Sequence, residues 1–238
     1  YPYATNHGNH EVLIETPFHN RDIPFMHPEE VESIIESYSQ RYAVLYGSDE
    51  TIETILVFRN HGQRAGTSLR HPHSQIVAMT LVPESVGHRQ RVAADYYQQN
   101  KRCLLCDMVR QEHADGSRLL AENDAFISFV PFAADVSCEI WIVPKQHCAD
   151  FGLITQREAQ ELAVLLQEGL QRLYDALDDP DYNYVIHSGS RQKTFVSHLH
   201  WYLQIRPRLS TPAGFEIGSG MTVNHSLPEE DAEKLRLA

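Results

Sequence analysis

The run His71-Pro72-His73-Ser74-Gln75 has residue types and spacing that could carry nucleophilic catalysis. His71, His73 and Gln75 occupy every second position, so on a β-strand they would face one side and could converge on one bound group. An imidazole placed there could attack an electrophilic centre of a substrate. Two histidines on a strand are more often structural or incidental than catalytic. Evidence for catalysis therefore has to come from the rest of the chain.

The loop before this run contains small residues that suit an anionic ligand. Gly66, Thr67 and Ser68 offer backbone N–H groups and hydroxyls, which can donate hydrogen bonds to phosphate oxygens. We therefore expect a phosphate group to bind beside the histidines.

Composition excludes some classes of function. A chain of 238 residues can form one large domain or two half-size domains. Its net charge of −12 argues against a nucleic-acid partner, because binding to a phosphate backbone requires clustered lysine and arginine. We find neither an apolar run of about 18 residues that could span a membrane nor a secretory signal. We therefore expect a cytoplasmic protein without a membrane partner.

The hydrophobic pattern predicts an α+β protein. Helical spacing predicts helices over residues 28–47, 86–101 and 155–177 and a short helix from residue 228. Thr155 and Glu158 form a capping box at the start of the third helix. Strands are predicted from His71 onward and over residues 10–16, 54–58, 125–130, 138–143, 182–186 and 200–204.

The second half of the chain repeats the order of elements in the first. Each half has a strand, a turn histidine, a helix, a strand, a loop and a strand with a histidine and a glutamine. The two histidines are separated by 52 positions from His19 to His71 and by 53 from His147 to His200. We therefore predict two tandem copies of one α+β unit, with antiparallel sheets flanked by helices.

The preferred alignment matches the polar residues of the two histidine strands: His71 with His200, His73 with Tyr202, and Gln75 with Gln204. In this alignment the first copy keeps the nucleophile and the second copy has lost it. Another register, which pairs His198 and His200 with the two histidines of copy one, would place Tyr202 opposite Gln75. The first strands of the copies align at a constant offset of 128: Glu11 with Glu139, Val12 with Ile140, and Ile14 with Ile142.

We place the boundary between the halves after residue 100, which gives domains 1–100 and 101–238. Cys103 lies 44 positions before His147, whereas only 18 residues precede His19. The first half is therefore predicted to be short at its N-terminus.

Cys103, Cys106, His147 and His200 could bind one zinc ion. Two thiolates and two imidazoles form a closed tetrahedral site, which would stabilise the fold rather than catalyse. Four cysteines are too few for a disulfide scaffold, so the Cys-x-x-Cys pair suits a metal site or a redox pair. The remaining alternative is two packed cysteines and two unrelated histidines.

Together these segments resemble the galactose-1-phosphate uridylyltransferase family, which belongs to the histidine-triad superfamily. The matching segments are Asn60-His61-Gly62, Gly66-Thr67-Ser68-Leu69-Arg70-His71-Pro72-His73-Ser74-Gln75, Cys103-x-x-Cys106, Trp141-Ile142-Val143-Pro144-Lys145-Gln146-His147 and Ala213-Gly214-Phe215-Glu216. The resemblance covers nearly the whole chain. It implies two histidine-triad-like halves, bound zinc, a homodimer with shared active sites, and ping-pong transfer of a nucleoside monophosphate through a covalent histidine adduct.

The resemblance also implies roles for the residues of the first half. His73 would be the nucleophile and Gln75 would hydrogen-bond the phosphoryl oxygens of the adduct. Asn60 and Ser68 would contact phosphate. Glutamine in place of a third histidine removes a titratable group near the leaving oxygen, which favours transfer over hydrolysis.

Other implied roles lie outside this strand. Phe215 and Glu216 would help to hold the hexose in the neighbouring subunit's site, and His19 and His71 would form half of a first zinc site. The family's first Cys-x-x-Cys and the segment that contacts the nucleobase do not occur in these 238 residues.

These features favour a nucleotidyltransferase that acts on a nucleotide sugar and a hexose 1-phosphate. The alternative within the same chemistry is a phosphorylase that splits a nucleotide sugar such as ADP-glucose with inorganic phosphate. An alternative of a different class is a non-catalytic nucleotide-binding module stabilised by zinc.

Overall fold

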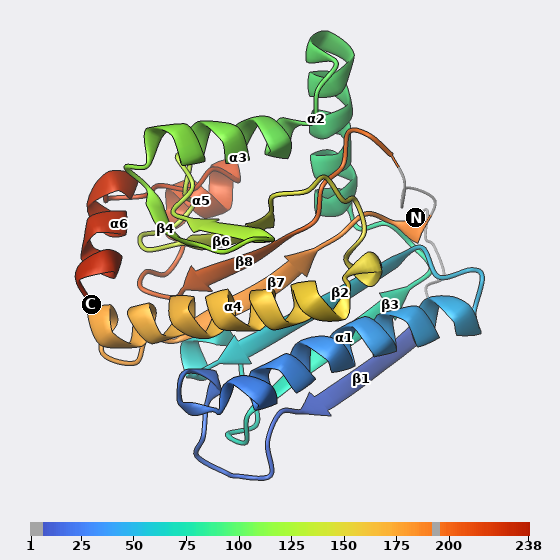
Figure 1. Ribbon diagram of the computed structural model, residues 1–238, viewed down its shortest axis with the longest axis horizontal. Helices are drawn as coiled ribbons and strands as arrows, with labels where there is room; N and C mark the ends of the chain where they lie inside the picture. Colours follow the sequence, from blue (N-terminus) through green and yellow to red (C-terminus); the bar gives the residue numbers. More distant parts are fainter. Residues whose placement is uncertain (1–6, 192–195) are drawn as a thin grey trace.

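The computed structural model describes residues 7–191 and 196–238. In this part of the chain, eight antiparallel strands form one sheet in the order β1-β3-β2-β7-β8-β6-β5-β4 (Figure 1). The strands are β1 (Gly8–Ile14), β2 (Thr54–His61), β3 (His73–Met79), β4 (Leu119–Glu122), β5 (Phe126–Phe129), β6 (Ile140–Pro144), β7 (Tyr182–His187) and β8 (Tyr202–Pro207). The helices are α1 (Pro28–Ser48), α2 (Glu84–Asn100), α3 (Leu104–Asp115), α4 (Gln156–Leu177), α5 (Gly214–Ser219) and α6 (Pro228–Leu237), with 3-10 turns η1 (Ile23–Phe25), η2 (Gln63–Ala65) and η3 (Phe151–Leu153).

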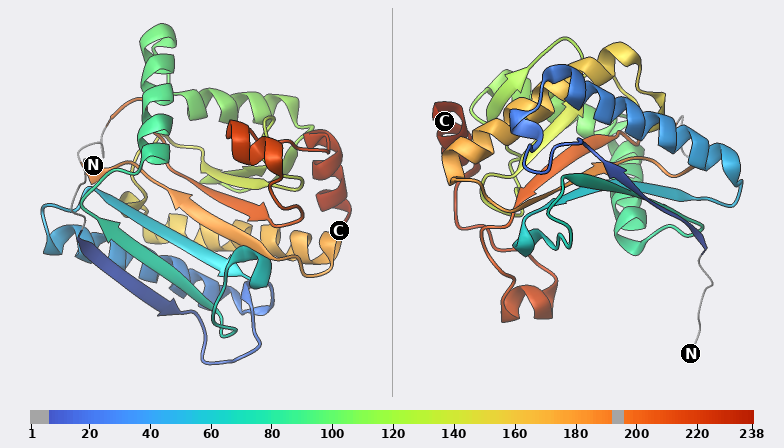
Figure 2. Two further views of the ribbon diagram at one scale, coloured as in Figure 1. Left: turned by 180° about the vertical axis from the view of Figure 1, so that it is seen from behind. Right: turned by 90° about the horizontal axis from the view of Figure 1, so that it is seen from below.

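Helices α1 and α4 pack side by side on one face of the sheet (Figure 1; Figure 2, right). The amphipathic pattern of α4 explains its position, because its buried residues recur at helical spacing. They are Ala159, Leu162, Ala163, Leu165, Leu166, Gly169, Leu170 and Leu173. The Thr155 side chain accepts a hydrogen bond from the Glu158 N–H, which confirms the predicted capping box.

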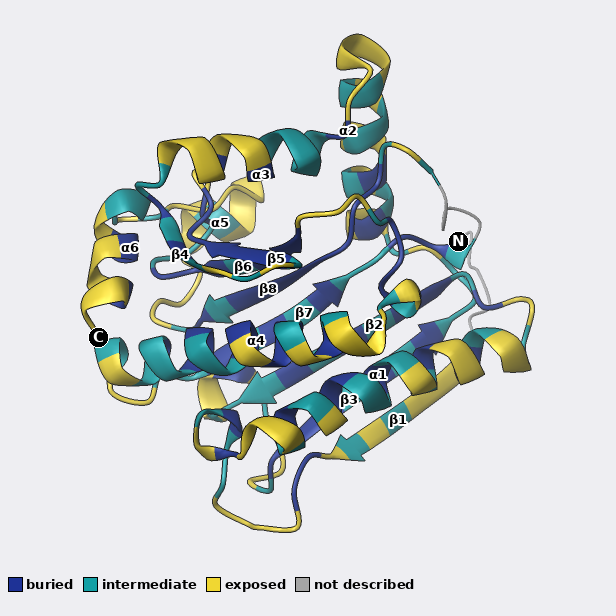
Figure 3. Cartoon of the chain, viewed as in Figure 1, coloured by how far each residue is buried: buried dark blue, intermediate teal, exposed yellow. Residues whose placement is uncertain are grey.

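The opposite face of the sheet is covered unevenly. Over the second half, α3 packs on the sheet through a buried cluster of Val109, Ile127, Phe129, Val143 and Tyr202. At the other edge, Val12 and Ile14 of β1 are 50% and 57% exposed. In Figure 3, β1 is coloured exposed and intermediate along its length.

The predicted α+β class and antiparallel pairing are confirmed. The units β1-α1-β2-β3 and β6-α4-β7-β8 have the same order of elements, and they join where β2 pairs with β7. Phe58 lies opposite Val185 at this junction. Strands from both halves therefore build one sheet, and the boundary after residue 100 stays a prediction.

The strand register corrects the predicted offset of 128. Val12 lies opposite Gln75 in β1–β3, and Trp141 lies opposite Gln204 in β6–β8. Val12 therefore corresponds to Trp141 and not to Ile140, at the offset of 129 that also separates the two glutamines. The burial pattern agrees with this register, because Val12 is half exposed whereas Ile140 is fully buried in the core.

Some elements differ from the sequence prediction. Strand β4 and helices α3 and α5 were not predicted, and β8 begins at Tyr202 rather than at His200. His200 instead lies in the segment before β8, where it contacts Cys106. None of the described helices combines the length and the apolar character needed to cross a membrane.

Candidate functional site

A cavity of about 540 Å³ lies where β2 and β3 meet the connecting loop. Its lining is mainly polar. It is drawn from β2, η2, the loop, the start of β3 and two more distant segments, before η1 and before β7: Asp22, Arg59, Asn60, His61, Gly62, Gln63, Thr67, Ser68, Leu69, Arg70, His71, Pro72, His73, Asp179 and Asp181. Most of the residues predicted to contact phosphate are therefore brought together. Gly66 and Gln75 are the exceptions, since neither lines the cavity. Gly66 ends η2 in a left-handed turn with φ of 86°, and the Gln75 side chain contacts His10 on β1.

His73 is held in one orientation by the backbone. Its Nδ1 lies 2.9 Å from the carbonyl oxygen of His71, to which it donates a hydrogen bond. This bond fixes the proton on Nδ1 and leaves the Nε2 lone pair for attack on a substrate. The side chain is 5% exposed and lines the cavity, so the nucleophile is largely screened from water.

Gln75 lies on the same strand face, two residues after His73, as alternation predicts. Its Oε1 lies 2.8 Å from Nε2 of His10 on β1. The amide NH2 group is thereby left to donate to a ligand. Ser74 points to the opposite face, where it contacts Glu15, Tyr38 and Tyr184 in the buried core.

The phosphate loop is tied to β7 by two side chains that sequence reasoning missed. Asn183 donates from Nδ2 to Asn60 Oδ1 at 2.7 Å and to the Ala65 carbonyl at 2.9 Å. Asp181 accepts from the backbone N–H of Arg64, beside Gly62. The run of acidic residues before β7 was the only sequence signal for Asp181, and it does not identify a partner.

A charged group on one wall of the cavity was also missed. His61 lies between Asp22 and Asp179, with nitrogen–oxygen distances of 3.5 Å and 3.1 Å. Burial opposes its charge, but the bonds to these carboxylates raise the pKa of His61. Burial likewise opposes ionisation of Asp22, yet His61 and Arg59 lower its pKa to about 2. Asp22 is therefore ionised at neutral pH and is paired with Arg59 rather than free.

Cys103, Cys106, His147 and His200 form a compact cluster beside α3. Their ligand atoms all lie within 4.8 Å of one another. The Cys106 Sγ lies 3.4 Å from Nδ1 of both histidines, close to the roughly 3.3–3.8 Å that separates neighbouring ligands in tetrahedral zinc sites. The donor set and its spacing therefore fit a divalent metal ion.

The surroundings of the cluster support metal binding. Nε2 of His147 faces the Val196 carbonyl at 3.4 Å, which leaves Nδ1 as the ligand atom. Hydrogen bonds from Cys106 and His200, against the effect of burial, lower the pKa of Cys103 to about 3. A thiolate therefore forms readily at the start of α3, where the helix dipole also favours negative charge.

His19 and His71 are also brought together. Their Nδ1 atoms lie 3.1 Å apart, and Nε2 of His71 lies 2.7 Å from the Thr16 carbonyl. His71 therefore has the same arrangement as His147: Nδ1 faces the candidate ligand position and Nε2 faces a backbone carbonyl. These two histidines supply at most half of a tetrahedral site.

Phe215 and Glu216 do not reach the His73 cavity. They lie on α5, which projects from the sheet side opposite α1 and α4 (Figure 2, right). Phe215 is 55% exposed, and Glu216 accepts a hydrogen bond from the backbone N–H of Ala213. Within one chain, these residues and His73 therefore form no common site.

The sequence matches two models of one family. The description "Galactose-1-phosphate uridyl transferase, N-terminal domain" applies over residues 1–83, and "Galactose-1-phosphate uridyl transferase, C-terminal domain" applies over residues 89–237. ADP-glucose phosphorylase of Arabidopsis thaliana is 37% identical, over 96% of this chain and 64% of the relative. Galactose-1-phosphate uridylyltransferase of Thermotoga maritima is 28% identical, over 95% of this chain and 73% of the relative.

Solved structures agree with these matches. A crystal structure of an ADP-glucose phosphorylase from Arabidopsis thaliana with bound ADP-glucose superposes with a TM-score of 0.90 at 35% identity. The superposition covers 97% of this chain and 74% of that chain. The chain spans 64% of the length of the plant relative, 73% of the Thermotoga relative and 74% of this solved chain.

Proposed function

Because the chain belongs to the galactose-1-phosphate uridyl transferase family, we propose that it transfers a nucleoside monophosphate from a nucleotide sugar through a covalent adduct on His73. The observation that carries this proposal is the hydrogen bond from His73 Nδ1 to the His71 carbonyl, at 2.9 Å, in a cavity with phosphate-binding groups. A non-catalytic module has no need for a nucleophile oriented in this way.

The reaction would proceed in two displacements. In the first, Nε2 of His73 attacks the α-phosphorus, a nitrogen–phosphorus bond forms, and the sugar 1-phosphate leaves with the electron pair of the broken phosphoanhydride bond. In the second, a phosphate oxygen of the acceptor attacks the same phosphorus and releases His73. The amides of Gln75 and Asn60 and the hydroxyls of Thr67 and Ser68 would donate to the phosphoryl oxygens as charge develops on them.

Two substrate pairs are compatible with this chemistry. The family description favours a uridylyltransferase with UDP-glucose and a hexose 1-phosphate. A phosphorylase that takes ADP-glucose and inorganic phosphate is supported by the higher identity to the plant ADP-glucose phosphorylase, at 37% against 28%. Both pairs use the same adduct and differ in the base and in the acceptor.

We further infer that the protein binds zinc and acts as a homodimer. Cys103, Cys106, His147 and His200 would hold a structural zinc ion, and His19 with His71 would contribute to a second site. A closed ligand set of this kind supplies folding free energy and no reaction step. Phe215 and Glu216 would complete the sugar site of the neighbouring subunit.

Labelling with nucleotide sugars tests the mechanism. The protein is incubated in turn with UDP-glucose and ADP-glucose that carry label in the α-phosphate, without an acceptor. We expect one of them to leave an acid-labile, base-stable label, as a histidine phosphoramidate would, and we expect His73→Ala to abolish label and transfer together. Gln75→Ala should keep some label and transfer about 10²-fold more slowly, the scale for one lost transition-state hydrogen bond.

A remote histidine provides the matched control. His113 is exposed on α3, so His113→Ala should label and transfer like the wild type. Transfer without an adduct, or label that persists in His73→Ala, would replace this mechanism by direct displacement or by a binding role.

A further inference from the structure

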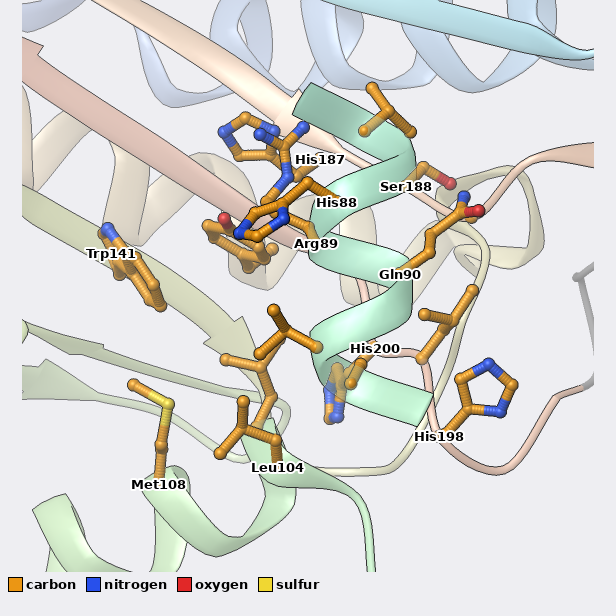
Figure 4. A pocket seen from close by; sticks show the side chains of 17 residues that line it. His88, Arg89, Gln90, Leu104, Met108, Trp141, His187, Ser188, His198 and His200 are labelled. Carbon is orange, nitrogen blue, oxygen red and sulfur yellow. The ribbon is translucent and has the colours of Figure 1, made fainter. Parts of the chain in front are cut away.

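The second half of the chain has its own cavity, of about 310 Å³, on the sheet face covered by α2 and α3 (Figure 4). The strand register makes it the counterpart of the His73 cavity. Phe58 lies opposite Gln75 in the first half and Val185 opposite Gln204 in the second. His187 and Tyr202 thus stand where Asn60 and His73 stand in the first half, and both line the second cavity. The two cavities share no lining residue.

This second cavity has lost the nucleophile for phosphoryl transfer. Tyr202 takes the place of the His73 imidazole, and its ring is packed between Trp141 and His187. The side chains of Leu104, Leu105 and Met108 close the side toward α3. Arg89 and Gln90 add polar groups to this lining, and its apolar part suits a flat, uncharged ring.

An aromatic wall gives the cavity a preference for flat rings. The Trp141 and Tyr202 rings lie 4.4 Å apart, and the His187 ring lies 4.6 Å from Tyr202 on its other side. Figure 4 shows Trp141, Met108 and Leu104 around the space below His187. Offset stacking on aromatic rings stabilises planar ligands.

His187 contributes to this cavity a polar atom that has no hydrogen-bond partner among the described residues. His187 donates from Nε2 to Gln204 Oε1 at 2.7 Å, so its buried Nδ1 is an acceptor, and it has no hydrogen bond in the structure. Burial, together with the Arg89 guanidinium, lowers the pKa of His187 to about 3, so Nδ1 keeps its lone pair at neutral pH. A buried acceptor of this kind favours a ligand that brings an N–H or O–H donor.

We propose that this second cavity binds a planar nitrogen heterocycle with an N–H donor, such as the base of a nucleoside, as a non-catalytic site separate from the His73 cavity. The ring would stack on the aromatic wall, and its N–H would donate to Nδ1 of His187. A volume of about 310 Å³ lies at the lower end of the range of roughly 300–1,000 Å³ for small-molecule sites, which suits a nucleoside without an attached sugar phosphate.

Intrinsic fluorescence allows the binding to be measured at this site. The chain has two tryptophans, of which Trp141 lines the second cavity and Trp201 is buried in the core against Phe126 and Phe151. Adenosine added to the zinc-loaded protein should quench the emission saturably. In Trp141→Phe the quench should vanish, because the remaining tryptophan has no contact with the cavity.

Two neighbouring alanines on α2 give a matched pair of variants. Ala93 lines the second cavity and Ala94 does not, so Ala93→Phe should fill the space and abolish binding while Ala94→Phe preserves it, as measured by calorimetry. N6,N6-dimethyladenosine keeps the ring and lacks the N–H donors, so it should bind the wild type about tenfold more weakly, the scale for one lost hydrogen bond to a buried group.

The outcomes separate this proposal from the transfer mechanism. Binding in His73→Ala at wild-type affinity is expected, since the nucleophile lies in the other cavity. Absence of saturable binding at millimolar adenosine, equal affinity of the dimethylated analogue, or binding that survives Ala93→Phe would overturn the proposal. None of these results depends on whether a histidine adduct forms.

Discussion

Among single residues, His61 shows how the charge on the wall of the His73 cavity is controlled. Its ring stacks on Tyr182, with centroids 4.8 Å apart, and its nitrogens face Asp22 and Asp179. These carboxylates raise its pKa above the ordinary value of 6.5. A raised folded-state pKa contributes stability that is complete below pH 6.5 and is lost as the pH rises through the folded-state value.

We therefore expect the stabilising effect of His61 to depend on pH. The difference in unfolding free energy between the wild type and His61→Gln should be larger at about pH 6 than at about pH 8.5, in urea titrations at both values. His225→Gln, at an exposed position for which no ion pair is found among the described residues, serves as the control for histidine loss. A difference that grows toward alkaline pH would contradict the assigned ion pairs.

The sequence correctly predicted those site residues whose orientation follows from local periodicity. His73 and Gln75 face one side because alternation along a strand requires it. The partners Asp22, Asp179 and Asp181 were not predicted, because they come from distant segments that only the assembled sheet brings to the cavity. No local pattern distinguishes them from ordinary surface carboxylates.

Among the loops and helices, the turn at Gly62 holds the phosphate loop in place. Gly62 has φ of 83°, and a Cβ atom there would lie 1.9 Å from Oδ1 of Asp181. Gly62→Ala should therefore displace the loop and slow nucleotidyl transfer by about 10²-fold, since small misplacements in a reacting site have effects of this size. Steady-state transfer rates measure it.

A glycine in open space provides the control for this substitution. Gly47 lies near the end of α1 and a Cβ atom there would meet nothing within 4 Å, so Gly47→Ala should transfer at the wild-type rate. Wild-type transfer by Gly62→Ala would show that the loop backbone does not position the phosphates.

Helix α3 begins at the cysteine pair, which couples metal binding to packing of the sheet. Cys103 is its N-cap, and Val109 in its middle belongs to the buried cluster on β5 and β6. We expect Cys103→Ser to lose bound zinc from a starting value of one ion per chain and to lower the melting temperature by roughly 5–10 °C. Elemental analysis and calorimetry test both parts.

Cys148, which is half-buried like Cys106, provides the control for Cys103→Ser. Cys148 lies outside the cluster and donates to the Asp150 carbonyl at 3.2 Å, so Cys148→Ser should retain the metal. Unchanged zinc content and melting temperature in Cys103→Ser would exclude the site.

The long elements were predicted well because their patterns are strong. Helix α4 has both an apolar stripe and a capping box, and the predicted bounds agree closely with the observed ones. Helices α3 and α5 were missed for different reasons. Helix α3 is capped by Cys103 and contains Cys106, and this pair was interpreted as a metal motif; α5 has only six residues, none of them buried. Short elements without a buried face carry little periodicity.

In the whole molecule, α5 lies apart from the His73 cavity of the same chain. Phe215 and Ile217 are 55% and 77% exposed on α5, and neither lines that cavity. If these residues serve the neighbouring subunit, neither His73→Ala nor Phe215→Ala homodimers should transfer efficiently. Mixed dimers should recover roughly a quarter of wild-type activity, because half are heterodimers with one intact site each.

This complementation requires subunit exchange, which brief treatment with mild denaturant and dialysis of the mixed variants would provide. The same variants refolded separately are the control. Full activity of a monomer at micromolar concentration, or absence of recovery in exchanged dimers that sedimentation confirms, would show that each chain completes its own site.

The internal repeat was the whole-molecule feature that the sequence predicted best. The residue offset between the first strands of the two copies was predicted wrongly. The order of elements and the histidine spacing indicated two copies. The offset of 128 was wrong because the apolar residues Val12 and Ile14 were matched with Ile140 and Ile142 by type, whereas the sheet places the first pair on the open face and the second in the core. Residue type cannot reveal which face a protein leaves uncovered.

The pairing of β2 with β7 also determines how long one edge of β2 stays unpaired during synthesis of the chain. Val57 of β2 is paired with Ile186 of β7, so β2 keeps one unpaired edge until residues 182–187 leave the ribosome. At synthesis rates of about 5–20 residues per second, that wait lasts roughly 6–25 s. An apolar strand edge left open for so long is a template for pairing between nascent chains. Ribosome spacing and the supply of chaperones should therefore govern the yield of this protein more strongly than its final stability does.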